Sequence, residues 1–268
     1  MLQTILLTGA TDGIGLATAK QLATQGHHLI LHGRNLDKLQ LVQKQLLLLA
    51  ESSKVDIVVA DLSDLQDVKK LADNIKKSYN RLDVLINNAG VFKVTNAKNA
   101  NNLDLRFVVN SIAPFYLTTL LSSLLGSTGR VINLSSAAQA KVDHQALIGK
   151  VNLEDMQAYA QSKLAIRLWS RGLSIKENYP TLIAVNPGSL LASKMVKEGF
   201  GIAGNDISIG ADILTKLSTD KDIASHNGEY YDNDLGRYSS DIDLIEEQQM
   251  ARQVIQSIES ILQDLNLN

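Results

Sequence analysis

The sequence predicts an α/β fold, a single-domain Rossmann-type doubly wound parallel sheet of about seven strands flanked by helices. Short apolar runs alternate with longer amphipathic segments along the whole chain, as expected of buried parallel strands joined by helices. Polar or glycine-containing motifs follow six of these runs, at the strand ends where sheets of this kind bind ligands. The 268 residues are enough for one large core.

The elements follow from these patterns in chain order. The expected strands are Leu2–Thr8, His28–His32, Val55–Ala60, Val84–Asn87, Arg130–Leu134, Leu182–Val185 and Glu229–Tyr231. The expected helices are Gly13–Gln25, Asn35–Glu51, Leu65–Tyr79, Leu103–Leu125, Asp155–Asn178, Ile209–Leu217 and a last one near Asp241–Leu265. No linker or repeat interrupts them, so residues 1–268 are expected to form one domain.

Composition narrows the class of protein. The net charge of −2 gives no reason to expect a nucleic-acid partner, and the absence of cysteine excludes disulfides and thiolate chemistry. The five histidines show no metal-ligand spacing, so no metal site is expected. No basic region precedes the first apolar run, and the longest apolar stretch, Ile112–Leu125, is short and interrupted by polar residues. We therefore expect a cytoplasmic protein without a membrane partner.

A glycine-rich turn follows the first apolar run, in the segment Thr8–Gly15 with glycines at positions 9, 13 and 15. A strand, a glycine turn and a helix form the context of a phosphate-binding site, because glycines let the backbone approach a pyrophosphate and the helix N-terminus offers free N–H groups. A tight connection without a ligand is the alternative. The strand before it and the helix after it favour the phosphate site.

Tyr159 and Lys163 lie four residues apart, which places both side chains on one helix face. A neighbouring ammonium favours the phenolate and lowers the pKa of a tyrosine. Such a pair can exchange a proton with the oxygen of a carbonyl or alcohol. A tyrosine and a lysine on a solvated face would have the same spacing, so the glycine turn is what favours a catalytic role.

Taken together, these motifs make the chain resemble the short-chain dehydrogenase/reductase family over nearly its whole length. Within that family the layout is similar to the retinol-dehydrogenase-like and WW-domain-oxidoreductase-like group. The residues that carry the resemblance are Thr8-Gly9-x-x-x-Gly13-x-Gly15, Asp61, Asn87-Asn88-Ala89-Gly90, Asn110, Ser136, Tyr159-x-x-x-Lys163 and Pro187-Gly188.

The resemblance implies roles for four catalytic residues. Tyr159 would be the general acid in carbonyl reduction, Lys163 would lower its pKa and hold the nicotinamide ribose, and Ser136 would donate a hydrogen bond to the substrate oxygen. The neighbouring Ser135 would be a turn residue, with exchanged roles as the alternative. Asn110 would support a water chain to the lysine. Because Pro114 has no N–H, we expect the Asn110 carbonyl to be free to bind that water, or the proline merely to kink the helix.

The same resemblance predicts the cofactor site, which Tyr159 and Lys163 would share. Its other residues are Thr8, Gly9, Thr11, Asp12, Gly13, Ile14, Gly15, Arg34, Asn35, Asp61, Leu62, Asn88, Ala89, Gly90, Pro187 and Gly188. Asp61-Leu62 would contact the adenine, with a helix N-cap as the alternative role of Asp61.

The choice of cofactor depends on the end of the second strand. An acidic residue about 20 residues past the glycine motif binds the ribose 2′-hydroxyl in NAD-dependent sites. Here Gly33 stands where that acid is expected and Arg34 follows, and a guanidinium suits a 2′-phosphate. We therefore expect NADP(H), with NAD(H) as the alternative. Asp12 argues against a strict preference, because it occupies a place where some NADP-dependent relatives carry a base.

Two further segments are variable. The segment near 189–206 is expected to be a lid over an apolar substrate, or a plain surface loop. It carries Ala192 where relatives usually carry a threonine, and Ser189 or Ser193 could replace that hydroxyl. His144 is expected at the rim of the site. Relatives often associate through the helix after Lys163, so Leu168 and Trp169 would serve packing or the contacts of a homo-oligomer.

The function expected from these features is NADP(H)-dependent hydride transfer to or from a small apolar ketone, aldehyde or secondary alcohol. The alternative is a non-catalytic cofactor-binding sensor or scaffold on the same fold. Intact Asn110, Ser136, Tyr159 and Lys163 favour the enzyme, because a binding protein needs no proton donor. The glycine spacing and the short C-terminal part favour it over an epimerase or dehydratase of the extended branch of the family.

Overall fold

The computed structural model describes residues 2–50, 53–239 and 243–267, and its described part contains one eight-stranded sheet in the order β3-β2-β1-β4-β5-β6-β7-β8. Strands β1 to β7 are parallel, which confirms the predicted class, and β8 pairs antiparallel with β7. The extra strand follows a tight turn in which Gly236 has φ +65°. The strands are Thr4–Leu7 (β1), His28–Gly33 (β2), Val55–Val59 (β3), Val84–Asn87 (β4), Arg130–Leu134 (β5), Thr181–Asn186 (β6), Tyr230–Asp232 (β7) and Arg237–Ser239 (β8).

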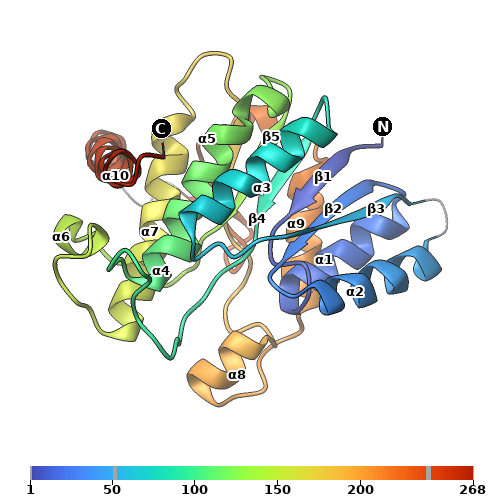
Figure 1. Ribbon diagram of the computed structural model, residues 1–268, viewed down its shortest axis with the longest axis horizontal. Helices are drawn as coiled ribbons and strands as arrows, with labels where there is room; N and C mark the ends of the chain where they lie inside the picture. The colour runs from blue at the N-terminus through green and yellow to red at the C-terminus, as the bar shows by residue number, and fades with distance from the viewer. Residues whose placement is uncertain (1, 51–52, 240–242, 268) are drawn as a thin grey trace.

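Helices cover both faces of the sheet (Figure 1). The layer formed by α1, α2 and α9 lies on one face, and the layer formed by α3, α5 and α7 lies on the other. The helices are Gly13–Thr24 (α1), Leu36–Leu49 (α2), Leu65–Ser78 (α3), Leu105–Phe107 (α4), Ala113–Leu125 (α5), His144–Leu147 (α6), Asp155–Leu173 (α7), Lys194–Phe200 (α8), Ser208–Thr219 (α9) and Leu244–Asp264 (α10), with a 3₁₀ turn at Ile223–His226. The predicted helix ends at Glu51 and Asp241 lie outside the described residues.

The two faces of the sheet bury separate cores, because successive side chains of a strand point to opposite faces. In β1, Leu6 packs into the core under α3, α5 and α7, whereas Ile5 and Leu7 pack into the core under α1, α2 and α9. All three are fully buried. Strands that are apolar on both faces therefore produce the near-continuous apolar runs seen in the sequence.

The strand order reverses at β1, which pairs with β2 on one side and with β4 on the other. The connections after β1 and β4 consequently leave the sheet toward opposite faces. Sheets of this kind open a crevice at the carboxyl ends of the strands where that reversal occurs. The reversal places the glycine turn after β1 next to the Asn87–Gly90 segment after β4.

The predicted helix Leu103–Leu125 is interrupted in the structure. Short α4 leads into a π-helical turn, Val108–Ile112, and only then into α5. Pro114 lies in the first turn of α5 and has no N–H for the carbonyl four residues earlier, that of Asn110. The wider hydrogen-bond spacing, from Ala113 N–H to the Val108 carbonyl, lies directly before the missing donor, and π-helical turns are frequent at functional sites.

The combined helix Leu105–Leu125 is long and apolar enough to cross a membrane by length and composition alone, which corrects the expectation that the chain holds no such segment. However, 72% of its most apolar window is buried inside the protein. Burial between the sheet and its neighbouring helices explains the apolar composition without a membrane.

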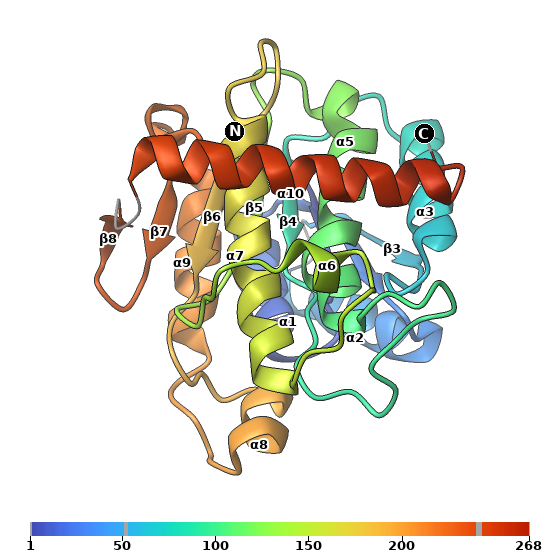
Figure 2. The ribbon, with the colours of Figure 1, turned by 90° about the vertical axis from the view of Figure 1, so that its left-hand side faces the viewer.

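The C-terminal helix α10 crosses over α7 and the α5 layer (Figure 2). Its Ala251, Val254 and Ile258 are fully buried, and a Cβ on Gly172 of α7 would come within 2.6 Å of Ile255 Cδ1. Leu168 and Trp169 of α7 are fully buried, so they serve packing within the chain. The expectation that these two residues could form subunit contacts is wrong, because α7 is already covered.

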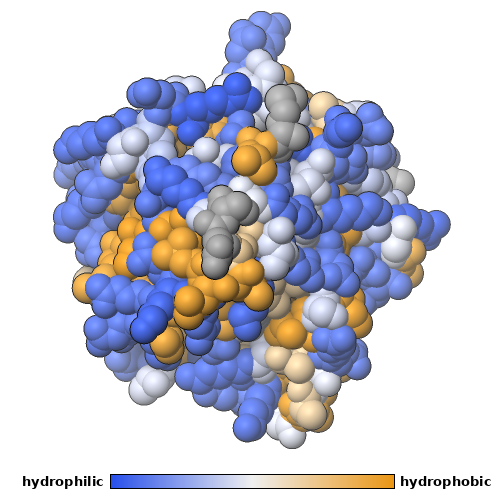
Figure 3. Space-filling model, turned by 90° about the vertical axis from the view of Figure 1, so that its right-hand side faces the viewer, coloured by the Kyte–Doolittle hydropathy of each residue, from blue (hydrophilic) through white to orange (hydrophobic). Residues whose placement is uncertain are grey.

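Helix α2 buries one row of side chains and exposes another. Leu39, Val42 and Leu46 pack against the sheet, whereas Leu41 and Leu48 are 58% and 75% exposed. The space-filling view of the molecular face at this edge of the sheet shows apolar surface among polar side chains (Figure 3). Helix α2 thus contains leucines that are not buried in the core.

Candidate active site

The glycine turn is fastened to the end of β4 by two side chains. Thr8 Oγ1 accepts hydrogen bonds from the N–H groups of Asn88 (3.0 Å) and Ala89 (3.1 Å). In return, Asn88 Nδ2 donates to the carbonyls of Thr8 (2.8 Å) and Gly9 (3.0 Å). Thr8, Asn88 and Ala89 thus shape the turn through internal hydrogen bonds, and their cofactor contacts stay a prediction.

Two of the glycines in this turn have no space for a side chain. A Cβ on Gly15 would collide with the Gly9 carbonyl oxygen and lie 2.5 Å from Asn88 Nδ2. A Cβ on Gly9 would lie 2.9 Å from Cα of Ala89, and Gly9 has φ +67°. Asp12 caps α1 by accepting a hydrogen bond from Gly13 N–H (2.7 Å). The backbone of the turn and the start of α1 together form the kind of cradle that a pyrophosphate needs.

The remaining predicted residues of the glycine turn pack outward from it. Thr11 Cγ2 would lie 2.9 Å from a Cβ on Gly33 at the end of β2. Ile14 lies against Gly210 of α9, where a Cβ would be 3.2 Å from Ile14 Cγ2. The turn thus packs between the end of β2 and the start of α9.

The ends of β2 and β3 provide the predicted residues Arg34, Asn35, Asp61 and Leu62. Arg34 is exposed, whereas Asn35 Oδ1 accepts from Lys38 N–H (2.9 Å) and caps α2. The cap of α3 is Asp64, so the alternative role of Asp61 as that N-cap is wrong. Leu62 is buried in the core and leaves only its backbone for a cofactor contact.

His32 is a site residue that the sequence argument missed. Its ring lies beneath the glycine turn, where Nδ1 accepts from Gly9 N–H (3.4 Å) and Nε2 lies 3.0 Å from the Ala60 carbonyl. Burial lowers the pKa of His32 to about 4, so the ring is neutral at pH 7. Its place at the end of β2, two residues before Arg34, was the signal that could have identified it.

Helix α7 brings Tyr159 and Lys163 to one face, as the spacing predicts. Lys163 Nζ donates to the Leu134 carbonyl at the end of β5 (2.8 Å) and lies 5.6 Å from the centroid of the Tyr159 ring. The side chain of Ser136 lies close enough to the Tyr159 phenol to act on its pKa, in the lowering direction. The phenol, the ammonium and the serine hydroxyl therefore meet where β5 ends.

The structure separates the two serines. Ser135 is buried, and its hydroxyl donates to the carbonyl of Lys163 (2.6 Å). Ser136 is partly exposed, and its Oγ accepts from Ala138 N–H (3.1 Å). Because Ser135 is used in fixing α7, Ser136 is the serine that remains for a substrate.

Asn110 completes the cluster from the π-helical turn. Its Oδ1 accepts from Val91 N–H (2.8 Å), and its Nδ2 donates to the Val91 carbonyl and to Ser162 Oγ (both 2.9 Å). A Cβ on Gly90 would lie 3.3 Å from Asn110 Oδ1 and 3.5 Å from Lys163 Nζ. Asn110 thus holds the β4 connection against α7, beside the lysine.

Burial changes both titrating groups of the pair. It raises the pKa of Tyr159, with the Ser136 hydrogen bond acting in the opposite direction. It also lowers the pKa of Lys163 to about 8. The expected lowering of the Tyr159 pKa by the lysine is therefore wrong. Desolvation raises the pKa of the phenol, and desolvation also disfavours the charge on the lysine that was expected to lower it.

The low pKa of Lys163 leads to a test by unfolding. Between about pH 8 and 10.5 the unfolded lysine holds a proton that the folded one has lost, so stability should rise with pH through this window. We expect the wild type to gain free energy of unfolding relative to Lys163→Met over this range, as measured by urea titration of both proteins. A constant difference between the two proteins would contradict a lowered lysine pKa.

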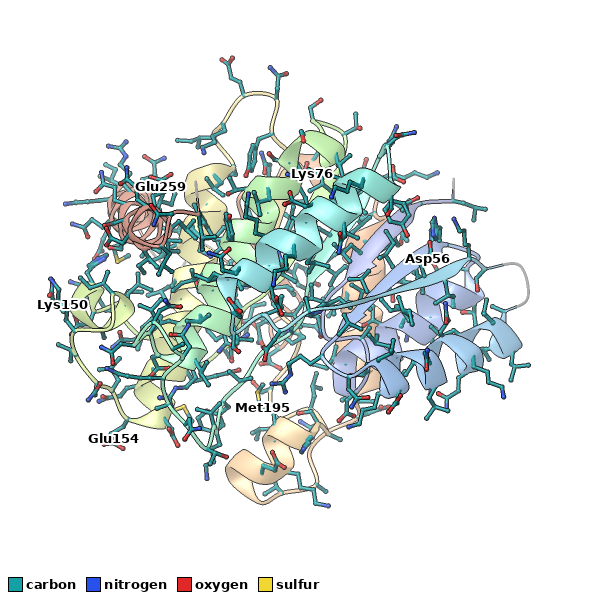
Figure 4. The ribbon with its side chains drawn as sticks, in the orientation of Figure 1. Asp56, Lys76, Lys150, Glu154, Met195 and Glu259 are labelled. Carbon is teal, nitrogen blue, oxygen red and sulfur yellow. The ribbon has the colours of Figure 1, made fainter. Side chains whose placement is uncertain are left out.

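The Pro187-Gly188 segment leads into helix α8, so the segment near 189–206 is partly helical. Gly199 of α8 lies so close to Phe92 that a Cβ there would be 2.7 Å from the ring. The Phe92 ring in turn lies 5.2 Å from that of Tyr159, centroid to centroid. Met195 lies between α8 and the rest of the protein (Figure 4). Phe92, which the sequence argument missed, therefore lies between Tyr159 and α8.

Both serines near Ala192 take part in internal hydrogen bonds, and whether either replaces the threonine of relatives stays a prediction. The Ser189 hydroxyl donates to Asp234 Oδ2, and Ser193 Oγ accepts from Val196 N–H (3.2 Å) as the cap of α8. His144 does not lie at the rim as expected, because its Nδ1 is 3.1 Å from Ser257 Oγ on α10. The cap and the Asp234 contact instead set the geometry of the segment that leads into α8.

Comparisons with known proteins agree with this geometry. The family model described as short chain dehydrogenase matches residues 3–200, which include the glycine turn and Tyr159. Retinol dehydrogenase 13 of Homo sapiens is 30% identical over 260 residues, covering 86% of this chain and 76% of that protein. Polyprenol dehydrogenase of Homo sapiens is 33% identical over 202 residues, covering 68% of this chain and 59% of that protein.

Solved structures share the fold. A short chain dehydrogenase from Shigella flexneri 2a str. 301, complexed with NADP, has a TM-score of 0.69 and 27% identity, covering 87% of this chain and 97% of that one. An uncharacterized protein from Mycobacterium paratuberculosis has a TM-score of 0.78 and 24% identity, covering 97% of this chain and 93% of that one. The second likeness concerns the fold alone.

Proposed function

Because this chain belongs to the short chain dehydrogenase family, we propose that it is an NADP(H)-dependent oxidoreductase that interconverts an apolar carbonyl compound and its alcohol. The observation that carries the proposal is the meeting of Ser136, Tyr159 and Lys163 beside the glycine turn. The space denied to a Cβ at Gly15, together with the start of α1 directly after the turn, fits a dinucleotide pyrophosphate.

The nicotinamide, when bound, supplies the hydride chemistry. The protein supplies the proton and holds the reacting oxygen. Ser136 Oγ donates a hydrogen bond to the substrate oxygen, where negative charge develops during reduction. Tyr159 transfers its phenolic proton to that oxygen, and its raised pKa keeps it protonated until then. Lys163, in turn, stabilises the phenolate that the transfer leaves behind.

The surroundings of Tyr159 support an apolar substrate. The ring of Phe92 covers one side of the phenol, and the buried Val196 belongs to helix α8 beyond it. Two relatives, retinol dehydrogenase 13 and polyprenol dehydrogenase, are named after apolar alcohols, which agrees with an apolar substrate. We also propose that the Asn110 carbonyl binds a water near Lys163, which follows from the missing N–H of Pro114.

The cofactor preference rests on the end of β2. A Cβ on Gly33 would lie 2.9 Å from Thr11 Cγ2, so an acid that would bind the ribose hydroxyls has no room there. Exposed Arg34 is the adjacent cation. We propose that Arg34 binds the 2′-phosphate, whereas Asp12 caps α1.

Replacing Arg34 with alanine should weaken NADPH binding about 10- to 100-fold, because a charge-assisted hydrogen bond contributes roughly 1.5–3 kcal/mol. NADH binding should change less than about twofold, because NADH lacks the phosphate. Fluorescence titration of both cofactors gives the ratio. Lys44→Ala, which removes an exposed cation further along α2, is the control. An equal loss of binding affinity for NADPH and NADH in Arg34→Ala would contradict the contact between Arg34 and the 2′-phosphate.

The test of the proposed function is NADPH oxidation with a broad panel of aldehydes and ketones, followed by the loss of NADPH absorbance. Turnover of apolar members would support the reductase. Saturable NADPH binding without turnover would favour the alternative, a cofactor-binding sensor or scaffold. The panel should include polar carbonyl compounds of matched size, whose preferential use would contradict the apolar substrate.

The cellular setting belongs to the same proposal. We propose a cytoplasmic enzyme of a small-molecule substrate, without a nucleic-acid or membrane partner and without a bound metal, built as one domain over residues 1–268. A homo-oligomer would not use the side chains of Leu168 and Trp169, because both are fully buried.

A further inference from the structure

Arg167 lies one helical turn after Lys163 on α7 and is 3% exposed. Its Nε donates to Oε1 of Glu247 on α10 at 3.0 Å, and Glu247 is 7% exposed. Removing two charges from water is costly, and their attraction offsets that cost only where further contacts satisfy them. A buried ion pair between α7 and α10 is therefore expected to make further contacts with neighbouring groups.

Two contacts lead from Arg167 toward the candidate active site. Its guanidinium lies over the ring of Tyr230 on β7, with Cζ 4.5 Å from the ring centroid. Its Nη1 donates to Oε1 of Gln139 at 3.4 Å. A cation over an aromatic face and a hydrogen bond in its plane both restrict the orientation of the guanidinium.

Both of these partners bind the same carbonyl, that of Ser136. The Tyr230 hydroxyl donates to it at 3.0 Å, and Gln139 Nε2 donates to it at 2.8 Å. Two donors from different segments fix the peptide plane that follows Ser136. The hydroxyl of the same residue accepts from Ala138 N–H at 3.1 Å and lies close enough to Tyr159 to act on the pKa of its phenol. The orientation of that hydroxyl consequently depends on contacts that begin at α10.

We propose that Glu247, Arg167, Gln139 and Tyr230 form a positioning network through which the C-terminal helix holds Ser136 in its reactive orientation. The inference rests on the proposed function, because it assigns Ser136 a substrate contact. None of the four residues is a catalytic residue, since each acts through the next one. Figure 2 shows α10 crossing α7, which is the arrangement that brings Glu247 to Arg167.

The first variant is Tyr230→Phe, which keeps the ring over Arg167 and removes only the hydroxyl. We expect kcat on the best carbonyl of the panel to fall about threefold to tenfold, the effect of one hydrogen bond. The KM for NADPH should stay unchanged, because the network does not reach the glycine turn. Tyr231→Phe is the matched control: the neighbouring residue of β7 packs into the opposite core.

The second variant is Glu247→Gln, which keeps the side-chain shape and removes the charge. The exposed Glu259 of the same helix provides the control, Glu259→Gln. Because the two changes act through one chain of contacts, Tyr230→Phe and Glu247→Gln together should lose less activity than the product of their separate losses. A double variant whose loss of kcat equals the product of the two single losses would contradict a shared path from Glu247 to Ser136.

Hydrogen–deuterium exchange of residues 135–143 provides a readout that needs no substrate. We expect faster exchange in Tyr230→Phe and Glu247→Gln and no change in the two controls. Unchanged exchange would overturn the network, even if kcat fell. Faster exchange with an unchanged kcat would overturn the reactive role of the network. Faster exchange in a protein whose wild type reduces no carbonyl would support the path to Ser136 and overturn the proposed function instead.

Discussion

Tyr159→Phe is expected to lower carbonyl reduction about 100- to 10,000-fold, the range that a positioned general acid contributes. The phenol is the group that meets both Ser136 and Lys163, and phenylalanine removes its hydroxyl while keeping the ring that packs on Phe92. The result is measured as NADPH oxidation with the best carbonyl from the panel. The loss should appear in kcat, because the proton is transferred in the chemical step.

The control for this change is cofactor binding. NADPH affinity should stay within about twofold of the wild type, since the loss belongs to the reaction and not to the site as a whole. A variant that retains more than about a tenth of the wild-type rate would show that Tyr159 is not the general acid. A variant that loses NADPH affinity and rate together would instead indicate a role in cofactor binding.

Local sequence patterns were sufficient to predict seven of the eight described strands and the shared helix face of Tyr159 and Lys163, whereas the roles of Ser136 and Asn110 came from the family resemblance. The apolar runs predict parallel strands because both faces of such strands are buried, and the spacing of Tyr159 and Lys163 predicts a shared helix face. In the structure Lys163 Nζ donates to the Leu134 carbonyl at the end of β5 and lies 5.6 Å from the centroid of the Tyr159 ring, and the catalytic roles of both residues stay predictions. Each of these inferences depends on residues close together in the chain, or on strand ends that a parallel sheet brings together.

Contacts between distant segments were not predictable in this way. Phe92 reaches Tyr159 from the connection after β4, and Arg167 meets Glu247 across 80 residues. Nothing in the local pattern of either segment indicates its partner. The direction of the Tyr159 pKa shift was missed for a related reason: the sequence gives the neighbouring charge, whereas the depth of burial depends on the whole fold.

Gly15→Ala should abolish measurable NADPH binding and destabilise the protein, because the added Cβ would have to displace backbone as well as a side chain. It would collide with the Gly9 carbonyl and press on Asn88 Nδ2, the group that donates to the carbonyls of Thr8 and Gly9. Overpacking of this kind costs about 1–3 kcal/mol, and each broken hydrogen bond adds about 1 kcal/mol. We expect the melting temperature to fall by several degrees and NADPH affinity to fall at least about 100-fold.

Gly236→Ala separates the effect of the collision from that of a glycine in general. Gly236 has φ +65° in the turn before β8, and a Cβ there would meet nothing within 4 Å. Alanine at that position should therefore lose only about 1 kcal/mol of stability through backbone strain and leave NADPH binding intact. If Gly15→Ala bound NADPH as well as Gly236→Ala does, the turn after β1 would not hold the pyrophosphate, and the cofactor site would have to lie elsewhere on the sheet.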